Sequence, residues 1–434
     1  MREGIDNGPI VVAIGNFDYS GGFRFSETKL KRYTSEFPTD YILTPGDILL
    51  AMTCQTSGGE ILGIPGMIPD DGEIYLHNQR LGKVIIKEPS LVCPEYLYWL
   101  FLSQPFNNFV FQRATGTKIL HTSPKKIMEY ETKFPTLSEQ LNLSEVLCQV
   151  SNKIILNNQI NQTLEQMAQT LFKSWFVDFD PVKAKMNGEQ PKGMDAPFLS
   201  KEVASLFPEK LVESELGLIP EGWDVGTLDS HTSMIIDHRG KTPKKLGSDW
   251  VEEGYPAISA KNIKSKKIVR PDTIRFLDET TYRKWMKEPL VKGDIIMTSE
   301  APMGELYFFD GSQDFCLSQR LYGLRANSDV CNPVFLFDWL QTTQAKADME
   351  GRASGSTVLG IKQAELRKVK ILTPPKDILD KYSSIVSNLV DMTAKNNAQN
   401  ISLEKLRDTL LPKLLSGEID LENLQVEQAI AIAE

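Results

Sequence analysis

The sequence lacks the residues and runs that several classes of protein require. Only four histidines and five cysteines occur among 434 residues, and no two cysteines have the CxxC spacing of a zinc or redox site. No run of about 18 uninterrupted apolar residues is present, and the N-terminus has no long apolar segment of the kind found in signal peptides. We therefore expect reduced, mostly buried thiols, no metal site, and a cytoplasmic location.

Catalytic motifs are also missing. The sequence contains no Gly-rich phosphate loop ending in Gly-Lys-Ser/Thr, no GxGxxG after a strand, no HExxH and no GxSxG elbow. A metal-dependent nuclease needs clustered carboxylates with a nearby lysine, and neither Asp272 nor the pair Asp278-Glu279 has a lysine at a suitable spacing. The sequence therefore offers no candidate catalytic residue, and we expect a protein that is not itself an enzyme.

The net charge of -9 is spread unevenly along the chain. Residues 223–292 contain fourteen Lys and Arg against ten Asp and Glu, whereas residues 376–434 contain six against ten. A phosphate group responds to the charge within about one Debye length, roughly 10 Å at 0.1 M salt, and not to the total charge of the chain. The acidic total is therefore compatible with a local basic surface.

In place of catalytic motifs, the sequence contains a long internal duplication. Residues 113–117, Arg-Ala-Thr-Gly-Thr, return 239 positions later as Arg-Ala-Ser-Gly-Ser at 352–356, and the Asn-Asn pair at 157–158 returns at 396–397. Small slips of the offset extend the match upstream to residue 45. This period is far longer than that of a solenoid repeat, so it predicts two copies of one domain, each followed by a long helix.

Two segments have the residue spacing of a helix pair. From residue 143 to residue 175, apolar residues and asparagines alternate at intervals of four and three, which is typical of a coiled-coil seam. We predict long helices at 137–176 and 376–416 that form a coiled coil. The seam positions are Leu143, Leu147, Val150, Ile154, Asn157, Asn161, Leu164, Ala168, Leu171 and Trp175 in the first helix, and Tyr382, Val386, Leu389, Thr393, Asn396, Asn400, Leu403, Arg407, Leu410 and Leu414 in the second.

Two asparagines occupy equivalent seam positions in each helix. If the two copies pack about a pseudo-twofold axis, the helices run antiparallel, and Asn157 lies near Asn400 while Asn161 lies near Asn396. A buried asparagine lowers stability but penalises a slipped alignment, because a slip leaves its amide facing leucine. The duplication favours this role in setting the register; a solvated edge of the helix is the alternative.

The residues around the helices predict two α+β globules. Short apolar runs alternate with short helical patterns in both copies. Between 177 and 222 the chain is irregular and rich in Pro and Gly, which is typical of a linker. We therefore predict globular domains at 1–136 and 223–375, a linker at 177–222, and a tail at 417–434. The apolar runs lie at 48–50, 84–86, 295–297 and 306–309, and the short helices at 96–101 and 333–342.

Basic and polar loops of both copies are candidates for DNA contact. Arg and Lys bind guanine edges or phosphates, Asn suits adenine, and a Gly-containing turn offers N–H groups to a phosphate. The alternatives are solvated charged faces and, for the repeated Arg-Ala-Ser/Thr-Gly loops, a fixed structural turn; the Gln-Arg pairs at 79–80 and 319–320 are assigned to the fold. The candidates are Arg24, Lys31, Arg32, Arg113, Thr115, Thr117 and Lys118 in the first copy, and His238, Arg239, Lys241, Thr242, Lys244, Lys245, Lys261, Asn262, Lys264, Lys266, Lys267, Arg352, Ser354 and Ser356 in the second.

Two peptides in the middle of the chain are distinctive. Residues 171–185 read Leu-Phe-Lys-Ser-Trp-Phe-Val-Asp-Phe-Asp-Pro-Val-Lys-Ala-Lys, and residues 215–223 read Glu-Leu-Gly-Leu-Ile-Pro-Glu-Gly-Trp. With the order domain, long helix, domain, long helix, they resemble the central region of the DNA specificity subunits of type I restriction-modification systems. The resemblance covers almost the whole chain. It implies two α/β target recognition domains in a pseudo-twofold arrangement, separated by two antiparallel helices that form a coiled coil.

The resemblance also implies a function without a catalytic centre in this chain. Each target recognition domain is expected to read one half of an interrupted sequence in double-stranded DNA, while the helices set the distance between the halves. Two modification subunits are expected to dock on the helices and supply adenine methylation that depends on S-adenosylmethionine. Restriction subunits are expected to add ATP-driven translocation and cleavage. S-adenosylmethionine, ATP and Mg are therefore all expected in the partner subunits and none in this chain.

The first copy departs from the second at its start. The second domain runs some thirty residues from Trp223 to the segment Gly-Tyr-Pro-Ala-Ile at 254–258, whereas the first reaches the matching residues 8–11 almost at once. A misplaced start codon, a truncated gene and a naturally short domain are the alternatives. If the segment is truly missing, we expect weak or one-sided DNA recognition, because half-site reading depends on residues 1–136. Two other classes stay open: a nuclease with an unfamiliar site, which predicts metal-dependent cleavage by the chain alone, and a stand-alone DNA-binding or coiled-coil scaffold protein.

Overall fold

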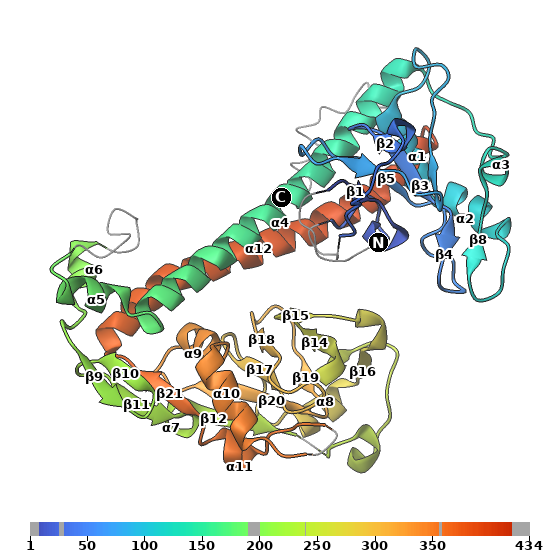
Figure 1. Ribbon diagram of the computed structural model, residues 1–434. Helices are drawn as coiled ribbons and strands as arrows, with labels where there is room; N and C mark the ends of the chain where they lie inside the picture. The colour runs from blue at the N-terminus through green and yellow to red at the C-terminus, as the bar shows by residue number, and fades with distance from the viewer. Residues whose placement is uncertain (1–7, 26–29, 190–199, 239, 356–357, 419–434) are drawn as a thin grey trace. The chain divides into compact units, whose positions relative to one another are not determined.

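The computed structural model describes residues 8–25, 30–189, 200–238, 240–355 and 358–418 (Figure 1). The chain forms two compact units: residues 1–158 with 397–434, and residues 159–396. Both boundaries fall inside long helices, which are α4 (Leu137–Phe176) and α12 (Lys376–Leu415). Each unit therefore contains one mixed α/β globule and part of each long helix.

The first unit contains three small sheets. Its strands are β1 (Ile10–Val11), β2 (Ile42–Leu43), β3 (Ile48–Ala51), β4 (Thr53–Cys54), β5 (Pro65–Met67), β6 (Tyr75–Leu76), β7 (Leu81–Lys83) and β8 (Leu120–His121). Strand β3 pairs antiparallel with β5 and β7, and β6 pairs parallel with β1 and antiparallel with β2. The apolar run 84–86 is not a strand, because β7 ends at Lys83 and the side chain of Ile85 is 70% exposed.

Short helices complete the core of the first unit. They are the 3-10 helices η1 (Ile14–Asn16) and η2 (Thr39–Tyr41) and the helices α1 (Pro94–Leu102), α2 (Gln104–Gln112) and α3 (Pro124–Ile127). Helix α1 begins at a proline, which suits the first position of a helix because that N–H needs no helical partner. Its buried Tyr96 and Trp99 pack with Leu143 and Leu147 of α4 and with Leu414 of α12. Helix α1 therefore anchors the first globule to the long helices.

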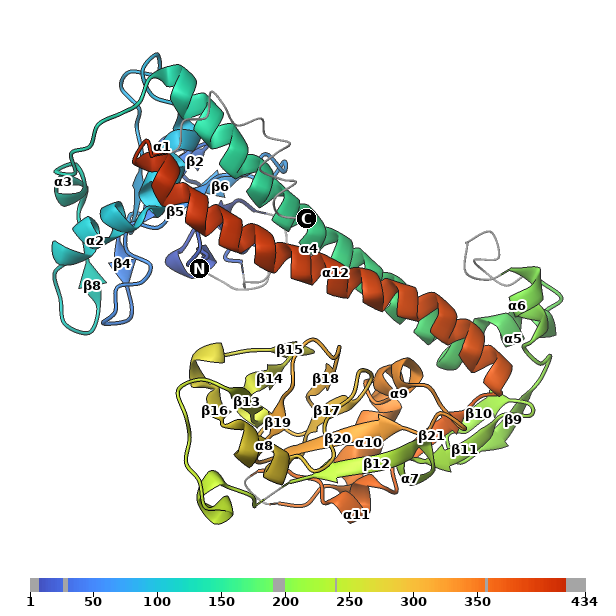
Figure 2. The ribbon, with the colours of Figure 1, turned by 180° about the vertical axis from the view of Figure 1, so that it is seen from behind.

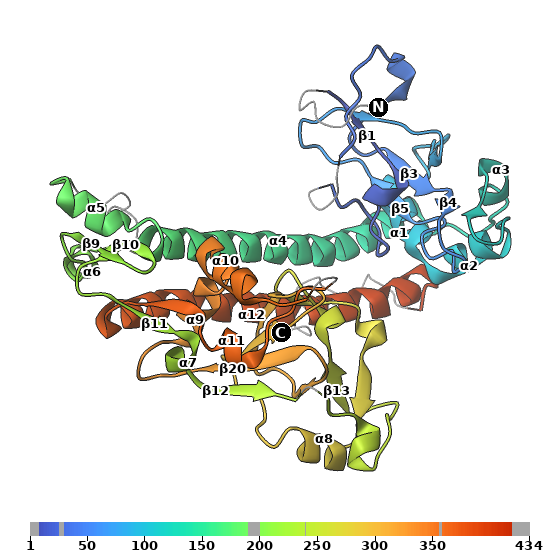
Figure 3. The same cartoon turned by 60° about the horizontal axis from the view of Figure 1, so that its bottom comes forward.

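The second unit contains larger sheets. Its strands are β9 (Leu211–Ser214), β10 (Gly217–Pro220), β11 (Asp224–Thr227), β12 (Thr232–Asp237), β13 (Tyr255–Ile258), β14 (Ile263–Lys264), β15 (Lys267–Ile268), β16 (Arg275–Leu277), β17 (Ile295–Thr298), β18 (Leu306–Phe308), β19 (Cys316–Leu317), β20 (Leu321–Ala326) and β21 (Lys370–Thr373). The main sheet has the order β12-β20-β17-β18 and is antiparallel throughout (Figure 2). Its strands β12 and β20 are also labelled in Figure 3. Along β17, Ile295 and Met297 belong to one core and Ile296 to another, because alternate residues of a strand face opposite sides.

Helices of the second unit pack on these sheets. They are α7 (Leu228–His231), α8 (Glu279–Trp285), α9 (Pro333–Trp339), α10 (Thr343–Arg352) and α11 (Gln363–Leu366), with the 3-10 helices η3 (Pro243–Leu246), η4 (Ala260–Asn262) and η5 (Pro271–Thr273). Helix α9 is capped by Asn332, whose side chain accepts the N–H of Phe335 at 2.7 Å. Phe335 then packs against Phe176 of α4, with ring centroids 4.9 Å apart.

The segment 177–222 differs from the irregular linker expected from its composition. It contains α5 (Asp180–Met186), α6 (Lys201–Ser205) and the hairpin of β9 with β10. Val182 and Ile219 are buried in the main core of the second unit. The prolines misled the sequence prediction because Pro181 lies in the first turn of α5, where a proline is well tolerated.

The two units repeat one arrangement of strands. In the first unit Ala51 of β3 pairs with Leu81 of β7, and in the second Thr298 of β17 pairs with Leu321 of β20. The parallel pair of β1 with β6 has its counterpart in β13 with β19. The second unit adds β12 beside β20, whereas within the described part of the first unit β7 pairs with β3 alone. The duplication in the sequence is therefore also a duplication of the strand frame.

Within each unit, α4 and α12 pack antiparallel, as can be followed in Figure 2. In the first unit, Val150 and Ile154 of α4 form an apolar cluster with Leu403 of α12. In the second unit, the rings of Phe172 and Tyr382 are 6.0 Å apart. Every position assigned to the seam from the sequence is buried or partly buried. Each helix has 40 residues.

A carboxyl group joins α9 to the start of α12. Tyr382 donates its hydroxyl to Asp338 Oδ2 at 2.5 Å, and Gln341 Nε2 donates to Oδ1 of the same carboxyl at 3.3 Å. Loss of water around the carboxyl raises the pKa of Asp338 to about 7. Burial, together with the nearby Asp338, also raises the pKa of Tyr382 well above its usual value. Burial therefore favours the protonated carboxyl and outweighs the hydrogen bond from Tyr382, which by itself favours the charged form.

The raised pKa of Asp338 predicts a pH-dependent stability. Because the folded protein binds this proton more tightly than the unfolded chain, the stability from this group is present below the unfolded pKa of about 3.8 and lost as pH rises through about 7. Asp338→Asn does not titrate, so the stability of the wild type relative to this variant should fall between pH 5 and pH 8. Urea unfolding at four pH values in this range measures the difference; parallel profiles would contradict the prediction.

Candidate nucleic-acid interface

Exposed lysines of the second unit are available to bind anions. Lys261, Lys264 and Lys267 lie in or beside the hairpin of β14 with β15, and Lys244 lies in η3. Within the described ranges, none of these four ammonium groups forms an ion pair or hydrogen bond. A set of unpaired lysines on loops is suited to phosphate oxygens, because the side chains can reach the ligand without giving up an internal partner.

The hairpin itself is held by its turn. Ser265 and Lys266 have φ values of 49° and 64°, as the two central residues of a tight hairpin turn require. The Ser265 N–H donates to Glu305 Oε2 at 2.8 Å, and the Lys266 ammonium binds the Glu165 carboxylate of α4. Lys266 is therefore occupied inside the unit, unlike the lysines on either side of it.

The loop that precedes and includes η3 uses its polar groups to hold itself together. Lys241 Nζ donates to the carbonyl oxygen of Trp285 at 2.8 Å, and partial burial lowers the pKa of Lys241. Lys245 Nζ donates to the carbonyl oxygen of Gly240 at 2.7 Å. Thr242 caps η3 by accepting the N–H of Lys245 at 3.3 Å. The structure therefore gives these three candidates internal roles and leaves Lys244 exposed.

His238 adds no positive charge to this loop at neutral pH. Burial, and secondarily the neighbouring Lys241, lowers the pKa of His238 to about 4. Its Nε2 atom is buried and has no hydrogen-bond partner among the residues described. Arg239, which we also proposed from the sequence, lies outside the described residues.

Asn262 is not a DNA-contacting residue. Its side chain is fully buried, and its Oδ1 accepts both the N–H and the hydroxyl of Ser259, at 3.1 and 2.9 Å. Its Nδ2 donates to Thr273 Oγ1 at 2.9 Å. The prediction from the sequence was wrong because a polar residue after a strand also suits a tight turn, where its amide replaces missing backbone partners.

Of the three candidates at the start of the first unit, the two arginines form hydrogen bonds inside the unit and the lysine is exposed. Both terminal nitrogens of Arg32 donate to the Glu73 carboxylate, at 2.9 and 2.8 Å, and this contact lowers the pKa of Glu73. Arg24 Nε donates to the carbonyl oxygen of Phe17 at 3.2 Å. The side chain of Lys31 is exposed. Arg32 therefore stabilises the fold, while Lys31 remains free to reach a ligand.

The repeated Arg-Ala-Ser/Thr-Gly loops have the same backbone in both units. Thr115 and His121 exchange two N–H to carbonyl hydrogen bonds of 2.9 and 2.8 Å, and Ser354 exchanges two of 2.9 and 3.0 Å with Gly360. Thr115 and Ser354 are exposed, as are Thr117 and Lys118, whereas Ser356 lies outside the described residues. The shared backbone supports the alternative that these loops are a fixed structural turn.

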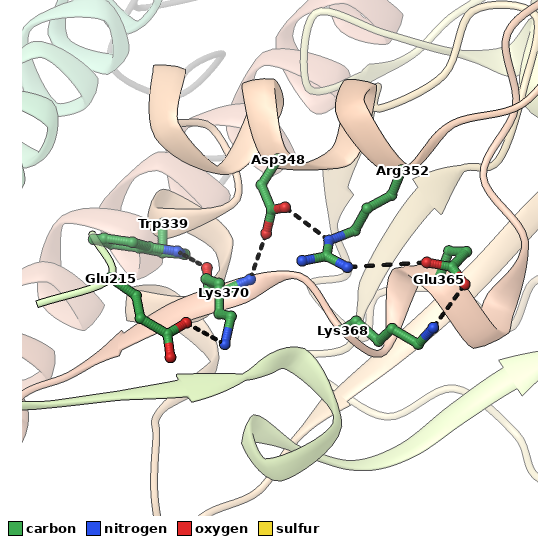
Figure 4. Close-up of polar contacts among 7 residues, drawn as sticks. All are labelled: Glu215, Trp339, Asp348, Arg352, Glu365, Lys368 and Lys370. Carbon is green, nitrogen blue, oxygen red and sulfur yellow. Dashed lines mark hydrogen bonds and ion pairs between the residues drawn. The ribbon is translucent and has the colours of Figure 1, made fainter. Parts of the chain in front are cut away.

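The arginine that begins each loop is engaged inside its own unit. Arg352 Nε donates to Asp348 Oδ1 at 2.7 Å, and its guanidinium lies 3.9 Å from Glu365 Oε2 (Figure 4). Asp348 also accepts the backbone N–H of Lys370 at 2.7 Å, which ties α10 to β21. Arg113 stacks over the ring of Phe109 at 3.7 Å. These contacts stabilise the fold and leave neither arginine free.

The four seam asparagines lie opposite each other. In the first unit, Asn157 Nδ2 donates to Asn400 Oδ1 at 2.9 Å, and Asn400 Nδ2 donates to Asn158 Oδ1 at 2.9 Å. In the second unit, Asn396 Nδ2 donates to Asn161 Oδ1 at 2.8 Å. The side chain of Asn157 is 1% exposed and that of Asn400 is 7% exposed. Each unit therefore contains one amide layer between its two helix segments.

The sequence prediction overlooked a pocket in the first unit. The pocket has a volume of about 450 Å³ and lies where β4, β8 and the start of β7 meet. From the sequence, Arg80 is assigned to the fold because the Gln-Arg pair is duplicated. A comparison of the two copies at residues 53 and 300 would have drawn attention to it, since threonine replaces a carboxylate there. The pocket is lined by Met52, Thr53, Gln55, Gln79, Arg80, Ile119, His121 and Thr122.

The cysteines are present as free thiols. All five cysteines are free and four of them are buried, which confirms the predicted thiols. In the part of the chain that the structure describes, no three His, Cys, Asp or Glu residues are grouped as metal ligands would be. Of the helices in these same ranges, none combines the length and apolar composition needed to cross a membrane.

Comparisons with known proteins agree with this arrangement. The family model for the type I restriction modification DNA specificity domain matches residues 6–166 and 220–405. The type I restriction enzyme HindI specificity subunit of Haemophilus influenzae is 26% identical over 375 residues, which cover 78% of this chain and 80% of that protein. The type I restriction enzyme MjaVIII specificity subunit of Methanocaldococcus jannaschii is 25% identical over 395 residues, which cover 89% and 82%.

A solved structure shares the fold. The crystal structure of the S subunit of a type I restriction-modification system from M. genitalium matches with a TM-score of 0.53 at 15% sequence identity. The match covers 94% of this chain and 92% of that chain.

The repeated loops predict a specific effect of alanine at Gly355. This glycine has a φ of 128°, and a Cβ atom there would collide with the carbonyl oxygen of Val358. Gly355→Ala should therefore destabilise the second unit by about 2 kcal/mol. Gly351→Ala is the matched control, because it lies in α10 with open space around it and should be neutral or stabilising. Equal urea midpoints for the two variants would show that the loop is not a structural turn.

Proposed function

Because the chain belongs to the family of type I restriction modification DNA specificity domains, we propose that it reads a bipartite target in double-stranded DNA for a type I restriction-modification complex. Specificity subunits of this family recognise a DNA sequence and are non-catalytic. The observation that carries the proposal is the strand frame built twice, because each copy has its own core and its own polar loops. Two separate reading surfaces are what a target with two halves requires.

In the second recognition domain, the lysines of the β14–β15 hairpin contact the DNA backbone. Lys264 and Lys267 are exposed on one hairpin whose turn is fixed by Glu305. Contacts from lysine to phosphate set the position of a protein on the duplex, while base edges are read by other groups in the grooves. Lys261, which lies shortly before β14, and Lys244, in η3, are also exposed in this domain.

The two long helices form a coiled coil that sets the spacing of the half-sites. A helix of 40 residues is about 60 Å long at roughly 1.5 Å per residue. At about 3.4 Å per base pair this length corresponds to roughly eighteen base pairs. The recognition domains are related by a pseudo-twofold axis, and the amide layers hold the helices in one register, since apolar seams alone permit slipped alignments.

Partner subunits dock on the outer faces of the helices. Ile155 and Leu156 of α4 and Ile401 of α12 are 53%, 49% and 67% exposed, although they are large and apolar. Exposed apolar groups of this kind favour a protein contact. We assign these faces to two modification subunits, which bring S-adenosylmethionine and methylate adenine. Restriction subunits then supply the steps that use ATP and Mg.

Methylation mapping tests the proposed function. Deletion of this gene in cells that keep the modification partner should abolish adenine methylation at one bipartite motif and leave every other methylated motif unchanged. Reintroduction of the intact gene should restore the same motif. The proposal fails if the methylome does not change on deletion, or if the purified chain alone cleaves DNA in the presence of a metal ion.

The amide layer of the first unit predicts that replacing one of its asparagines lowers the stability of the protein and that replacing both restores it. Asn157→Leu removes the donor to Asn400 Oδ1 in a buried layer, while Asn400 Nδ2 still donates to Asn158, so it should destabilise the protein by about 1–3 kcal/mol. The double variant with Asn400→Leu has an apolar layer and should regain stability, while losing the penalty against a slipped register.

Urea unfolding and methylation mapping separate these two effects. Asn152→Leu, at an exposed position of α4, is the control and should change neither. The double variant should methylate targets with more than one spacer length. A single spacer length in the double variant would show that the asparagines do not set the register.

A further inference from the structure

Arg80 in the first unit and Arg320 in the second occupy equivalent positions. Each directly precedes the first residue of a frame strand, Leu81 of β7 or Leu321 of β20, and each of these leucines pairs with the central strand of its sheet. Both arginines are exposed. The repeated backbone therefore presents a guanidinium at the same place in each unit.

The residue that faces the arginine differs between the units. Thr53 pairs across its strand with His121, and Glu300 pairs with Gly360, which lies 239 positions after His121. Thr53 and Glu300 are therefore equivalent positions. The duplication has a carboxylate at this place in the second unit and a hydroxyl in the first.

This difference changes the electrostatic state of the arginine. In the second unit, Arg320 Nε lies 2.9 Å from Glu300 Oε1, so the guanidinium is neutralised by its own chain. In the described part of the first unit, the guanidinium of Arg80 forms no ion pair or hydrogen bond. The Glu300 carboxylate shows which kind of ligand this frame accepts beside the arginine, namely an anion with oxygen atoms.

The pocket around Arg80 contains further hydrogen-bond donors. Gln55 and Gln79 line it with exposed side chains that each carry an NH₂ group. The hydroxyl of Thr122 is buried beside them and has no hydrogen-bond partner among the described residues. Buried polar groups in folded proteins usually have a hydrogen-bond partner. A ligand rich in oxygen atoms would provide hydrogen-bond acceptors for these donors and for Arg80.

We propose that the Arg80 pocket binds a phosphate group of the DNA backbone in the first recognition domain, an inference that rests on the proposed function. Phosphates project from the duplex and fit a hollow of about 450 Å³, whereas base edges lie recessed on the floor of the grooves. Arg80, Gln55 and Gln79 bind the phosphate oxygens. In the second recognition domain the equivalent arginine, Arg320, makes no such contact, because its guanidinium is already paired with the Glu300 carboxylate.

A substitution that introduces the carboxylate of Glu300 at the equivalent position of the first unit tests the proposal. Thr53→Glu places in the first unit the group that neutralises Arg320 in the second, and Arg80→Gln removes the positive charge while keeping a polar side chain. The matched control is the double variant Glu300→Gln with Arg320→Gln, which removes the equivalent ion pair without a change in net charge. Each full-length chain is assembled with its modification subunits, and its affinity for a duplex containing the methylated motif is measured at several salt concentrations.

Both first-unit variants should bind the duplex about tenfold more weakly, and the slope of log affinity against log salt should fall by about 1, as for the loss of one phosphate contact. The control should stay within about twofold of the wild type with an unchanged slope. The methylated motif should be the same in all variants, because a phosphate contact carries no base information. Affinity and slope equal to those of the wild type in both first-unit variants would overturn the proposal.

A second measurement separates the pocket from the proposed function. Inorganic phosphate, compared with chloride at equal ionic strength, should raise the Tm of the wild-type chain and of the control more than that of Thr53→Glu or Arg80→Gln. If the wild type binds no DNA, the proposed function fails and the phosphate arm alone decides whether the pocket takes an anion. Equal phosphate responses in all four proteins would reject the pocket even if the chain reads DNA.

Discussion

The packing of one short helix against both long helices is the contact on which the rest of each unit depends. In the first unit this helix is α1, whose Tyr96 and Trp99 share a core with Leu143 and Leu414. In the second it is α9, whose Phe335 packs against Phe176 and shares a core with Tyr382. Since α1 and α9 begin 239 residues apart, the duplication has preserved the anchor. Strands, loops and the polar groups they display are then positioned with respect to helices that are continuous across the boundary of each unit.

Features that repeat along the chain were predicted from the sequence, and features that depend on a partner were not. The seam is a periodic property, so the alternating spacing from Leu143 onward indicated which residues are buried. The helix bounds and the duplicated frame follow from patterns of the same kind, whereas the free, mostly buried thiols were expected because no two cysteines have CxxC spacing. The helices and hairpin within 177–222 were missed because proline is compatible with both a linker and the first turn of a helix.

The residues proposed for the candidate site also depended on partners that the sequence does not reveal. Asn262 has the residue type and loop position of an adenine contact, yet its amide closes a turn inside the protein. Arg32, Arg113 and Arg352 have the charge of phosphate contacts, but a carboxylate or an aromatic ring of the same unit engages each of them. Whether a cation is free is a property of tertiary structure, since it depends on residues far away in the sequence: 41 positions for Arg32 with Glu73, and 101 for Lys266 with Glu165. These three arginines therefore stabilise the fold. The unpaired lysines are left as the candidates for contact with phosphate groups of a nucleic acid.

The ion pair of Lys266 with Glu165 has a thermodynamic consequence. Lys266 lies at the tip of a hairpin bordered by free lysines, while Glu165 is on α4 in the same unit. A phosphate that takes Lys266 must compete with Glu165, so binding at the hairpin and the state of the helix surface are linked equilibria. Such linkage is reciprocal: a protein that binds Glu165 on the helix releases Lys266 and strengthens the hairpin's affinity for phosphate by the same factor. A partner that engages Glu165 and a nucleic acid that engages Lys266 would therefore each favour the binding of the other through this one surface contact.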